Sequence, residues 1–333
     1  MVHEKKIVEE VSGWLRVYDD GSVDRTWTGP PQVSFMAEPV MPHEKFIDGV
    51  AVKDVDTDSG VRVRIYLPEK ESTDSETLPI ILHFHGGGFC ISEASWFMYY
   101  DVYTRLARTT RSIVVSVYLR RAPEHRLPAA CEDSYNALLW LHALAKGNLH
   151  EPWLNAHADF TRVFLIGDST GGNLVHQVAA RAENEELSPL RLAGGILVQP
   201  GFLHATRSKS ELEQPQSPFL TLDMLDKFLN FALPLGSTKD HPITCPMGDA
   251  APPIGSLKMP PMMLCVAETD LIIDTEMEYY EAMKKAGKDV ELLFSAGVGH
   301  GFYMNKIAMD LDPLTATRAQ EMTAAITEFI RRH

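Results

Sequence analysis

Largely apolar residues gather in short runs along the chain. The runs lie at residues 78–82, 113–117, 163–166, 196–198 and 262–266. Strands that are covered on both faces carry such runs, so these segments predict the buried strands of a parallel sheet. Residues 61–66 alternate instead between apolar and charged positions, which predicts a strand with one wet face near a sheet edge.

Helix-length segments separate the predicted strands, at residues 96–107, 128–145 and 171–182. Alternation of strands and helices predicts an α/β fold with a mostly parallel, doubly wound sheet. A length of 333 residues fits one such domain with insertions, so we expect a single domain over residues 1–333.

Two segments break the alternation and are predicted to be additions to the core. Residues 1–45 precede the core, and residues 201–261 are rich in Pro, Ser and Met. Within the second segment, residues 222–229 have the spacing of an amphipathic helix. We expect both segments to cap a cleft in the core, because enzymes commonly cover their sites with such segments.

Charge and composition narrow the possible partners. Lys and Arg number 31 against 45 Asp and Glu, and the net charge of −14 disfavours nucleic acid and an anionic membrane surface. The first residues lack the apolar stretch of a signal peptide, and no apolar run is long enough to span a membrane. The four cysteines lie far apart in the sequence, which favours a reducing, cytoplasmic location.

Residues 167–171, Gly-Asp-Ser-Thr-Gly, match the G-x-S-x-G nucleophile elbow, a tight strand-to-helix turn that exposes its serine. The pattern alone is weak, and its context decides. A predicted strand at 163–166 leads into it and a helical segment at 173–180 leads out. Ser169 is therefore the candidate nucleophile.

A serine hydroxyl needs a base to take its proton. In proteins with this elbow, an acid and then a histidine follow the serine along the chain. His300 lies in a glycine-rich loop at 297–302, after a predicted strand at 290–294, and is the candidate base. The other histidines after Ser169 lie on the helix after the elbow, in the second cap segment or at the end of the chain: His176, His204, His241 and His333.

Three carboxylates compete for the role of orienting the histidine. Asp270 follows the predicted strand at 262–266 at a suitable distance and is preferred. Glu268 follows the strand so closely that its side chain can still point from it, and Asp274 is better explained as the N-cap of a helix at 275–285.

Residues 85–88, His-Gly-Gly-Gly, follow a buried strand and have the form of an oxyanion-hole loop. The amides of Gly87, Gly88 and Thr170 are the candidate donors. His83 and His85 have the spacing of a metal pair but lack further ligands nearby in the sequence, and no nucleotide-binding motif occurs. We therefore expect neither a metal nor a cofactor.

With these motifs assembled, the chain resembles the plant carboxylesterases, which are hormone-sensitive-lipase-like α/β hydrolases. The resemblance extends nearly end to end and rests on residues 13–25, 85–89, 120–130, 167–173 and 300–302. It implies an α/β-hydrolase fold, a triad of Ser169, Asp270 and His300, and an oxyanion hole of Gly87, Gly88 and Thr170.

The same family includes gibberellin receptors, which lack the catalytic histidine, and isoflavanone dehydratases, which carry threonine in place of the serine. This chain keeps all three triad residues, so we expect a carboxylesterase that acts on small esters or lactones. A lyase or cyclase of specialised metabolism and a non-catalytic receptor are the alternatives. Thr170 stands where alanine or serine is commoner, and its branched side chain is expected to bias the acyl group accepted. The oligomeric state stays open between a monomer and a weak dimer.

Overall fold

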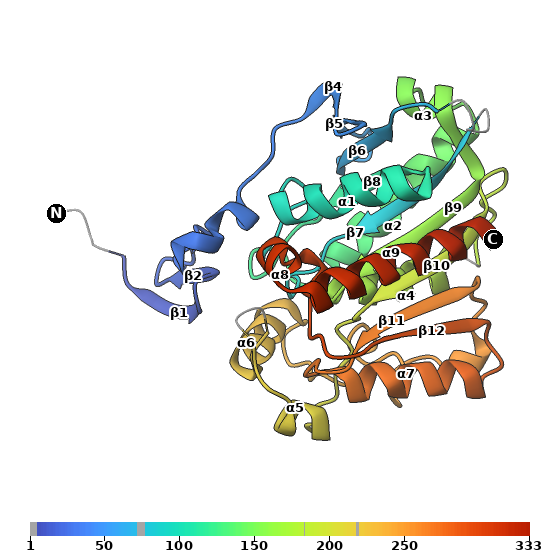
Figure 1. The fold of residues 1–333 in the computed structure, drawn as a ribbon. Helices are drawn as coiled ribbons and strands as arrows, with labels where there is room; N and C mark the ends of the chain where they lie inside the picture. The colour runs from blue at the N-terminus through green and yellow to red at the C-terminus, as the bar shows by residue number, and fades with distance from the viewer. Residues whose placement is uncertain (1–4, 72–76, 183, 218–219) are drawn as a thin grey trace.

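The structure is a computed structural model that describes residues 5–71, 77–182, 184–217 and 220–333. A nine-stranded sheet forms its centre (Figure 1). The strands are β4 (His43–Ile47), β5 (Val50–Asp56), β6 (Arg62–Pro68), β7 (Leu78–Phe84), β8 (Ile113–Tyr118), β9 (Ala158–Asp168), β10 (Leu192–Val198), β11 (Met262–Ala267) and β12 (Val290–Ser295).

The order of these strands is β12-β11-β10-β9-β7-β8-β6-β5-β4. Pairing is parallel from β12 to β8, and β6, β5 and β4 add antiparallel strands at one end. The predicted α/β class and the mostly parallel sheet are confirmed. The chain crosses from β7 to β8 on one side and then returns to β9 on the other, and α/β proteins bind ligands where the strand order reverses in this way.

Helices cover both faces of the sheet (Figure 1). On one face, α1 (Phe97–Thr110) packs against α9 (Pro313–Arg332). The other face carries α2 (Ala129–Ala145), α4 (Thr170–Ala182) and α7 (Ile273–Lys285). His176 of α4 and the Tyr279 hydroxyl of α7 are 2.9 Å apart and form a buried hydrogen bond, and burial lowers the pKa of His176 to about 4. His176 is thus a neutral structural residue.

The remaining elements are shorter. The strands β1 (Ile7–Val11), β2 (Leu15–Tyr18) and β3 (Val23–Asp24) form a separate antiparallel sheet near the N-terminus. The other helices are α3 (Pro152–His157), α5 (Lys209–Glu213), α6 (Leu222–Ala232) and α8 (Lys306–Leu311), with 3-10 turns η1 (Pro31–Ala37), η2 (Ile254–Ser256) and η3 (Phe302–Met304). The predicted helix at 222–229 is confirmed as α6, whose N-terminus is capped by the Thr221 hydroxyl.

The alternating strand lies further inside the sheet than its pattern predicts. β6 lies between β8 and β5, and β4 lies beyond β5. The predicted position near an edge, with one face in contact with water, is therefore wrong. Arg64 of β6 is 1% exposed, and its guanidinium donates to both carboxylate oxygens of Asp54 at 2.7 and 3.0 Å and to the Val40 carbonyl at 2.8 Å. A charged residue therefore occupies a covered face because its partners lie within the protein.

The hairpin of β4 and β5 has a sequence signal that apolar runs do not capture. Asp48 and Gly49 connect the two strands with φ values of 49° and 75°. Positive φ at both central residues is the geometry of a two-residue hairpin turn, for which an Asp-Gly pair is typical. Because β4 begins at His43, the main sheet includes the last residues of the predicted N-terminal segment.

Phe329 is the largest of the buried side chains by which helix α9 packs against the sheet. Phe329 is fully buried, and its ring lies 6.2 Å from the ring of Phe164 in β9. It also packs against Gly194 of β10, where an added Cβ would approach the ring to 2.7 Å. None of the helices in the described part of the chain is both long and apolar enough to cross a lipid bilayer.

We predict that Phe329→Ala lowers the free energy of unfolding by about 3–5 kcal/mol, because it removes a buried ring and leaves a cavity between α9 and the sheet. Leu311→Ala is the control, since Leu311 is 79% exposed and its loss should change stability by about 0.5 kcal/mol or less. Urea denaturation of the two variants measures the difference. Equal losses would contradict the packing described for α9.

Candidate active site

Ser169 occupies a strained turn between β9 and α4. Its φ of 50° lies in the left-handed region, which residues other than glycine seldom adopt. The Ser169 amide donates to the Val198 carbonyl at 2.9 Å, and its carbonyl accepts from the Gly201 amide at 2.9 Å. A Cβ at Gly171 would overlap the carbonyl oxygen of Phe84 at the end of β7. Strain of this kind persists where the surroundings impose it, and it is concentrated at functional sites.

Asp168 joins this turn to the glycine-rich loop after β7. Its carboxylate is buried, accepts a hydrogen bond from the Gly86 amide at 3.1 Å, and lies 3.2 Å from Nε2 of His83. Gly87 and Gly88 follow with φ values of 94° and 61°. In the described part of the chain, the amides of these two glycines donate to no backbone carbonyl.

The side chain of Thr170 ties the same loop to the start of α4. Its hydroxyl is buried and accepts a hydrogen bond from the Phe89 amide at 3.3 Å. The sequence predicts a role for the Thr170 amide in the oxyanion hole and a steric effect of its side chain on the acyl group, but not this hydrogen bond. The side-chain contact joins two loops that are distant in the sequence, so a local motif carries no signal of it.

Asp270 and His300 lie together, in the order predicted for the acid and the base. Oδ2 of Asp270 is 2.6 Å from Nδ1 of His300, and Oδ1 accepts from the Ile272 amide at 3.2 Å. Burial disfavours the imidazolium, but the charge and hydrogen bond of Asp270 outweigh it, and the pKa of His300 is raised above its usual 6.5. With Nδ1 bonded to Asp270, Nε2 is the nitrogen left for a reacting group.

Gln199, directly after β10, holds the loop that carries His300. It is buried, its Nε2 donates to the Gly299 carbonyl at 3.2 Å, and its Oε1 accepts from the Gly301 amide at 2.7 Å. One amide side chain thus fixes the backbone on both sides of the histidine. The sequence motifs miss Gln199. Its backbone φ of 48° is unusual for a residue other than glycine, but the sequence pattern does not reveal it.

The two competing carboxylates have other partners. Glu268 accepts from the Gly297 amide at 2.8 Å and supports the start of the histidine loop. Asp274 is not the predicted N-cap: α7 begins at Ile273, and Asp274 lies in its first turn, where its carboxylate accepts from the Ser210 amide at 2.7 Å. The correction has a physical reason, because α5 offers a donor to which Asp274 binds across the fold.

Glu276 is a further acid close to Asp270 that no motif predicts. It is completely buried on α7, and neither carboxyl oxygen has a hydrogen-bond partner among the described residues. Burial, together with the negative charge of Asp270, holds the pKa of Glu276 well above its usual range. Burial and the charge of Asp270 thus both favour the protonated form of Glu276.

Ser169 and His300 line the same cleft, which is partly open to solvent. Gly87, Gly88 and Thr170 line it as well, so the predicted site residues other than Asp270 share this space. The rest of the lining is mostly apolar and includes Trp14, Ile91, Met98, Leu220, Met224, Leu225, Phe228 and Leu229.

Comparison with known proteins identifies the family. A family profile described as the α/β hydrolase fold matches residues 81–304. "Probable carboxylesterase 6" of Arabidopsis thaliana is 37% identical over 332 residues, which cover 98% of this chain and 92% of that protein. The chain belongs to the plant carboxylesterase family of α/β hydrolases.

The relatives of this chain include proteins named as enzymes and a protein named as a receptor. Tuliposide A-converting enzyme 1 of Tulipa gesneriana is 32% identical over 95% of this chain and 77% of its own. A gibberellin receptor of Arabidopsis thaliana is 35% identical over 78% of this chain and 76% of its own. Among solved structures, an esterase of Pyrobaculum calidifontis matches with a TM-score of 0.67 and 27% identity, covering 89% of this chain and 87% of its own. The names of the relatives therefore do not decide between an enzyme and a receptor, and only the residues of the site can.

In this member of the carboxylesterase family, two distant segments meet above the cleft. Trp14 comes from the N-terminal segment, and Met224 and Phe228 come from α6. Lys227 on α6 donates to the Glu10 carbonyl of β1 at 2.8 Å and pairs with the Glu9 carboxylate at 3.4 Å. The two segments thus bind each other as well as the core.

We predict that His300 titrates above pH 6.5 and that Asp270→Asn lowers its pKa below that value. The substitution removes the charge that favours the imidazolium and leaves the burial that opposes it. Imidazole resonances followed by NMR against pH measure both values. His176, whose pKa is lowered to about 4 by burial alone, serves as the control and should be unaffected by the substitution. An unchanged His300 pKa in Asp270→Asn would contradict the described pair.

Proposed function

We propose that the protein is a serine carboxylester hydrolase that works through an acyl-enzyme on Ser169. The observation that carries the proposal is the 2.6 Å contact between Asp270 and His300 beside a serine held at a φ of 50° in the same cleft. Esterase names among the relatives and structural neighbours support the same chemistry.

In the proposed reaction, Nε2 of His300 accepts the Ser169 proton as the hydroxyl oxygen attacks the ester carbonyl carbon. The imidazolium that forms is stabilised by Asp270, which accepts the hydrogen bond from Nδ1. His300 then donates the proton to the departing alcohol. In the second half, His300 takes a proton from water as the water oxygen attacks the acyl carbon. The bond to the Ser169 oxygen then breaks, His300 returns the proton to Ser169, and the acid is released.

The negative charge on the carbonyl oxygen requires donors in place before the reaction. We assign this role to the amides of Gly87, Gly88 and Thr170. Two observations support the assignment: the amides of both glycines donate to no backbone carbonyl in the described part of the chain, and all three residues line the cleft. Asp168 and the Thr170 hydroxyl act as positioning groups, because they hold the two ends of the glycine loop.

The walls of the cleft favour a small, neutral and mainly apolar ester or lactone. Met224, Leu225 and Phe228 on α6 and Trp14 from the N-terminal segment present apolar surface opposite Ser169. The net charge of −14 also disfavours anionic substrates at a distance. We expect this chemistry to take place in the cytoplasm, without a cofactor.

A ligand receptor on the same fold is the second candidate, and the similarity to a gibberellin receptor is the observation that favours it. Binding alone needs neither proton transfer nor a strained serine. Lyase or cyclase chemistry would use the same site with His300 as the proton carrier. The two experiments below separate hydrolysis from these alternatives.

We expect an organophosphate to attach covalently and stoichiometrically to Ser169, because His300 activates this hydroxyl. Intact-mass measurement and peptide mapping locate the label. Ser92 also lines the cleft, so Ser92→Ala is the matched control and should keep the label, whereas Ser169→Ala should lose it. A folded protein that takes no label would favour the receptor.

Among the three acids after β11, only Asp270 should matter for turnover. Asp270→Asn is expected to lower kcat for a short p-nitrophenyl ester by about 10³–10⁴-fold, because the imidazole loses its orienting partner and correct tautomer. Glu268 binds the Gly297 amide at the start of the histidine loop, and Asp274 binds the Ser210 amide. Neither acid is hydrogen-bonded to the imidazole in the structure, so Glu268→Gln and Asp274→Asn should each cost a small fraction of that loss. Comparable losses in Glu268→Gln would move the assignment to that residue.

A further inference from the structure

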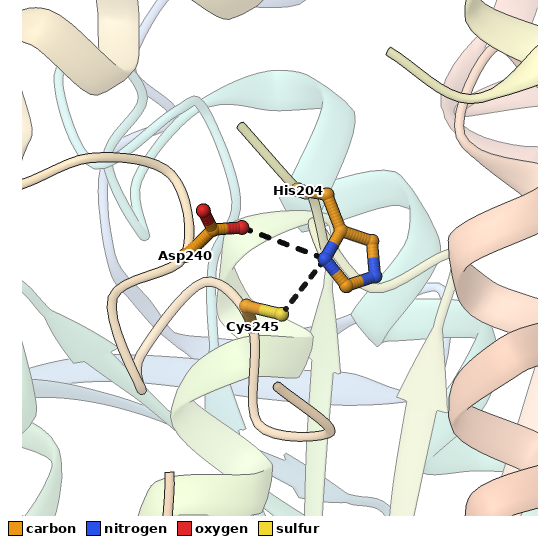
Figure 2. A group of neighbouring side chains, drawn as sticks. All are labelled: His204, Asp240 and Cys245. Atoms are coloured by element: carbon orange, nitrogen blue, oxygen red, sulfur yellow. Dashed lines mark hydrogen bonds and ion pairs between the residues drawn. The ribbon is translucent and has the colours of Figure 1, made fainter. Parts of the chain in front are cut away.

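A second cluster of reactive side chains lies outside the cleft (Figure 2). His204 follows β10, and Asp240 and Cys245 lie in the turns between α6 and β11. Each offers one donor atom, and the three atoms lie within 4.8 Å of one another; no other such group occurs in the described residues. Nδ1 of His204 lies 3.3 Å from Sγ of Cys245 and 3.5 Å from Oδ1 of Asp240.

The hydrogen bond at Nε2 of His204 determines whether Nδ1 presents a proton or a lone pair to Cys245 and Asp240. Nε2 of His204 is 2.8 Å from a carboxylate oxygen of Glu278 on α7, which can only accept. A neutral ring that donates there presents a lone pair at Nδ1. Cys245 can donate its thiol proton to that lone pair, but Asp240 opposes it with a negatively charged oxygen. A cation bound between the three atoms removes this conflict, as a proton on Nδ1 also does.

We propose that His204, Asp240 and Cys245 form a binding site for a zinc ion. Nitrogen, sulfur and carboxylate oxygen are the donors that Zn²⁺ takes in proteins. At tetrahedral angles, bonds of about 2.3 Å to sulfur and about 2.0–2.1 Å to nitrogen and oxygen place S and N about 3.5 Å apart and N and O about 3.3 Å apart. The separations of 3.3 and 3.5 Å in the structure differ from these by a few tenths of an ångström.

Charge and protonation fit the same ion. A thiolate and a carboxylate together neutralise Zn²⁺, and the exposed side of Asp240 leaves a fourth position for water. Zinc binds a cysteine as the thiolate, so binding would release the thiol proton of Cys245 to solvent. Glu278 takes the part of the carboxylate that orients a metal-binding histidine.

The backbone around the donors is already held in place. The Leu203 amide donates to the Thr244 carbonyl at 2.8 Å, and the Ala205 amide donates to Asp240 at 3.0 Å. Asn173 of α4 donates to the carbonyls of Gly201 and Ile243 at 3.0 and 2.8 Å. The ion would therefore clamp the segment after β10 to the turns before β11, which stabilises the fold without entering the proposed ester chemistry.

Calorimetric titration of the chelator-treated, full-length protein with zinc sulfate tests the site. We expect one ion per chain in the parent and in Cys131→Ser, whose half-buried thiol lies on α2 outside the cluster. Cys245→Ser and His204→Ala should lose that binding. Asp240→Asn should also weaken zinc binding. Because Asp240 is exposed, this variant should fold even if a substitution at a buried ligand does not. Circular dichroism of each chelated variant checks its fold.

Cobalt gives a readout that a purely structural role for the cluster would not produce. Co²⁺ should produce a thiolate-to-cobalt charge-transfer band in the parent and in Cys131→Ser, and no band in Cys245→Ser. Glu278→Gln keeps all three ligands and should weaken zinc binding by about 10- to 100-fold. Zinc should raise the Tm of the parent and leave that of Cys245→Ser unchanged. A folded parent without stoichiometric binding, or a cobalt band that survives Cys245→Ser, overturns the proposal.

Discussion

The close approach of the β9–α4 turn to the end of β7 is the constraint on which the site depends. Only glycine fits at position 171, where the turn meets the Phe84 carbonyl. The buried Asp168 carboxylate binds the Gly86 amide across the same gap. Together with the hydrogen bond from the Phe89 amide to the Thr170 hydroxyl, these contacts fix Ser169 and the glycine loop relative to each other.

The acid and the histidine reach this place from the other half of the sheet. In a parallel sheet the carboxyl ends of the strands share one edge, so the loops after β7, β9, β11 and β12 converge there. The convergence of these loops does not by itself fix the backbone of the loop that carries His300. Gln199 binds the loop at Gly299 and Gly301, and Glu268 binds it at Gly297, which gives His300 a fixed backbone on both sides.

Local patterns predict a large part of this structure. The apolar runs mark the parallel strands, and the elbow, the histidine loop and the acid after β11 lie where their order along the chain predicts. Arg64 misleads because its burial depends on Asp54 and Val40, which lie outside β6. Gln199 and the group around His204 are missed for the same reason: their roles arise from contacts between segments that the sequence separates widely, as His204 and Cys245 are. Glu276 is missed because its burial depends on how α7 packs.

Two parts of the molecule differ in how freely their residues can be substituted. One is the sheet with the loops that follow its strands, and the other is the pair of outer segments that Lys227 and β1 link together. Ser169, Asp270 and His300 are all carried by the sheet, whereas much of the apolar wall opposite them belongs to α6 and the segment around Trp14. Substitutions in the wall can alter which molecule fits without disturbing Ser169, Asp270 and His300. A scaffold of this design can therefore diversify its ligands by exchanging its outer segments, and Trp14 makes the N-terminal segment part of that choice.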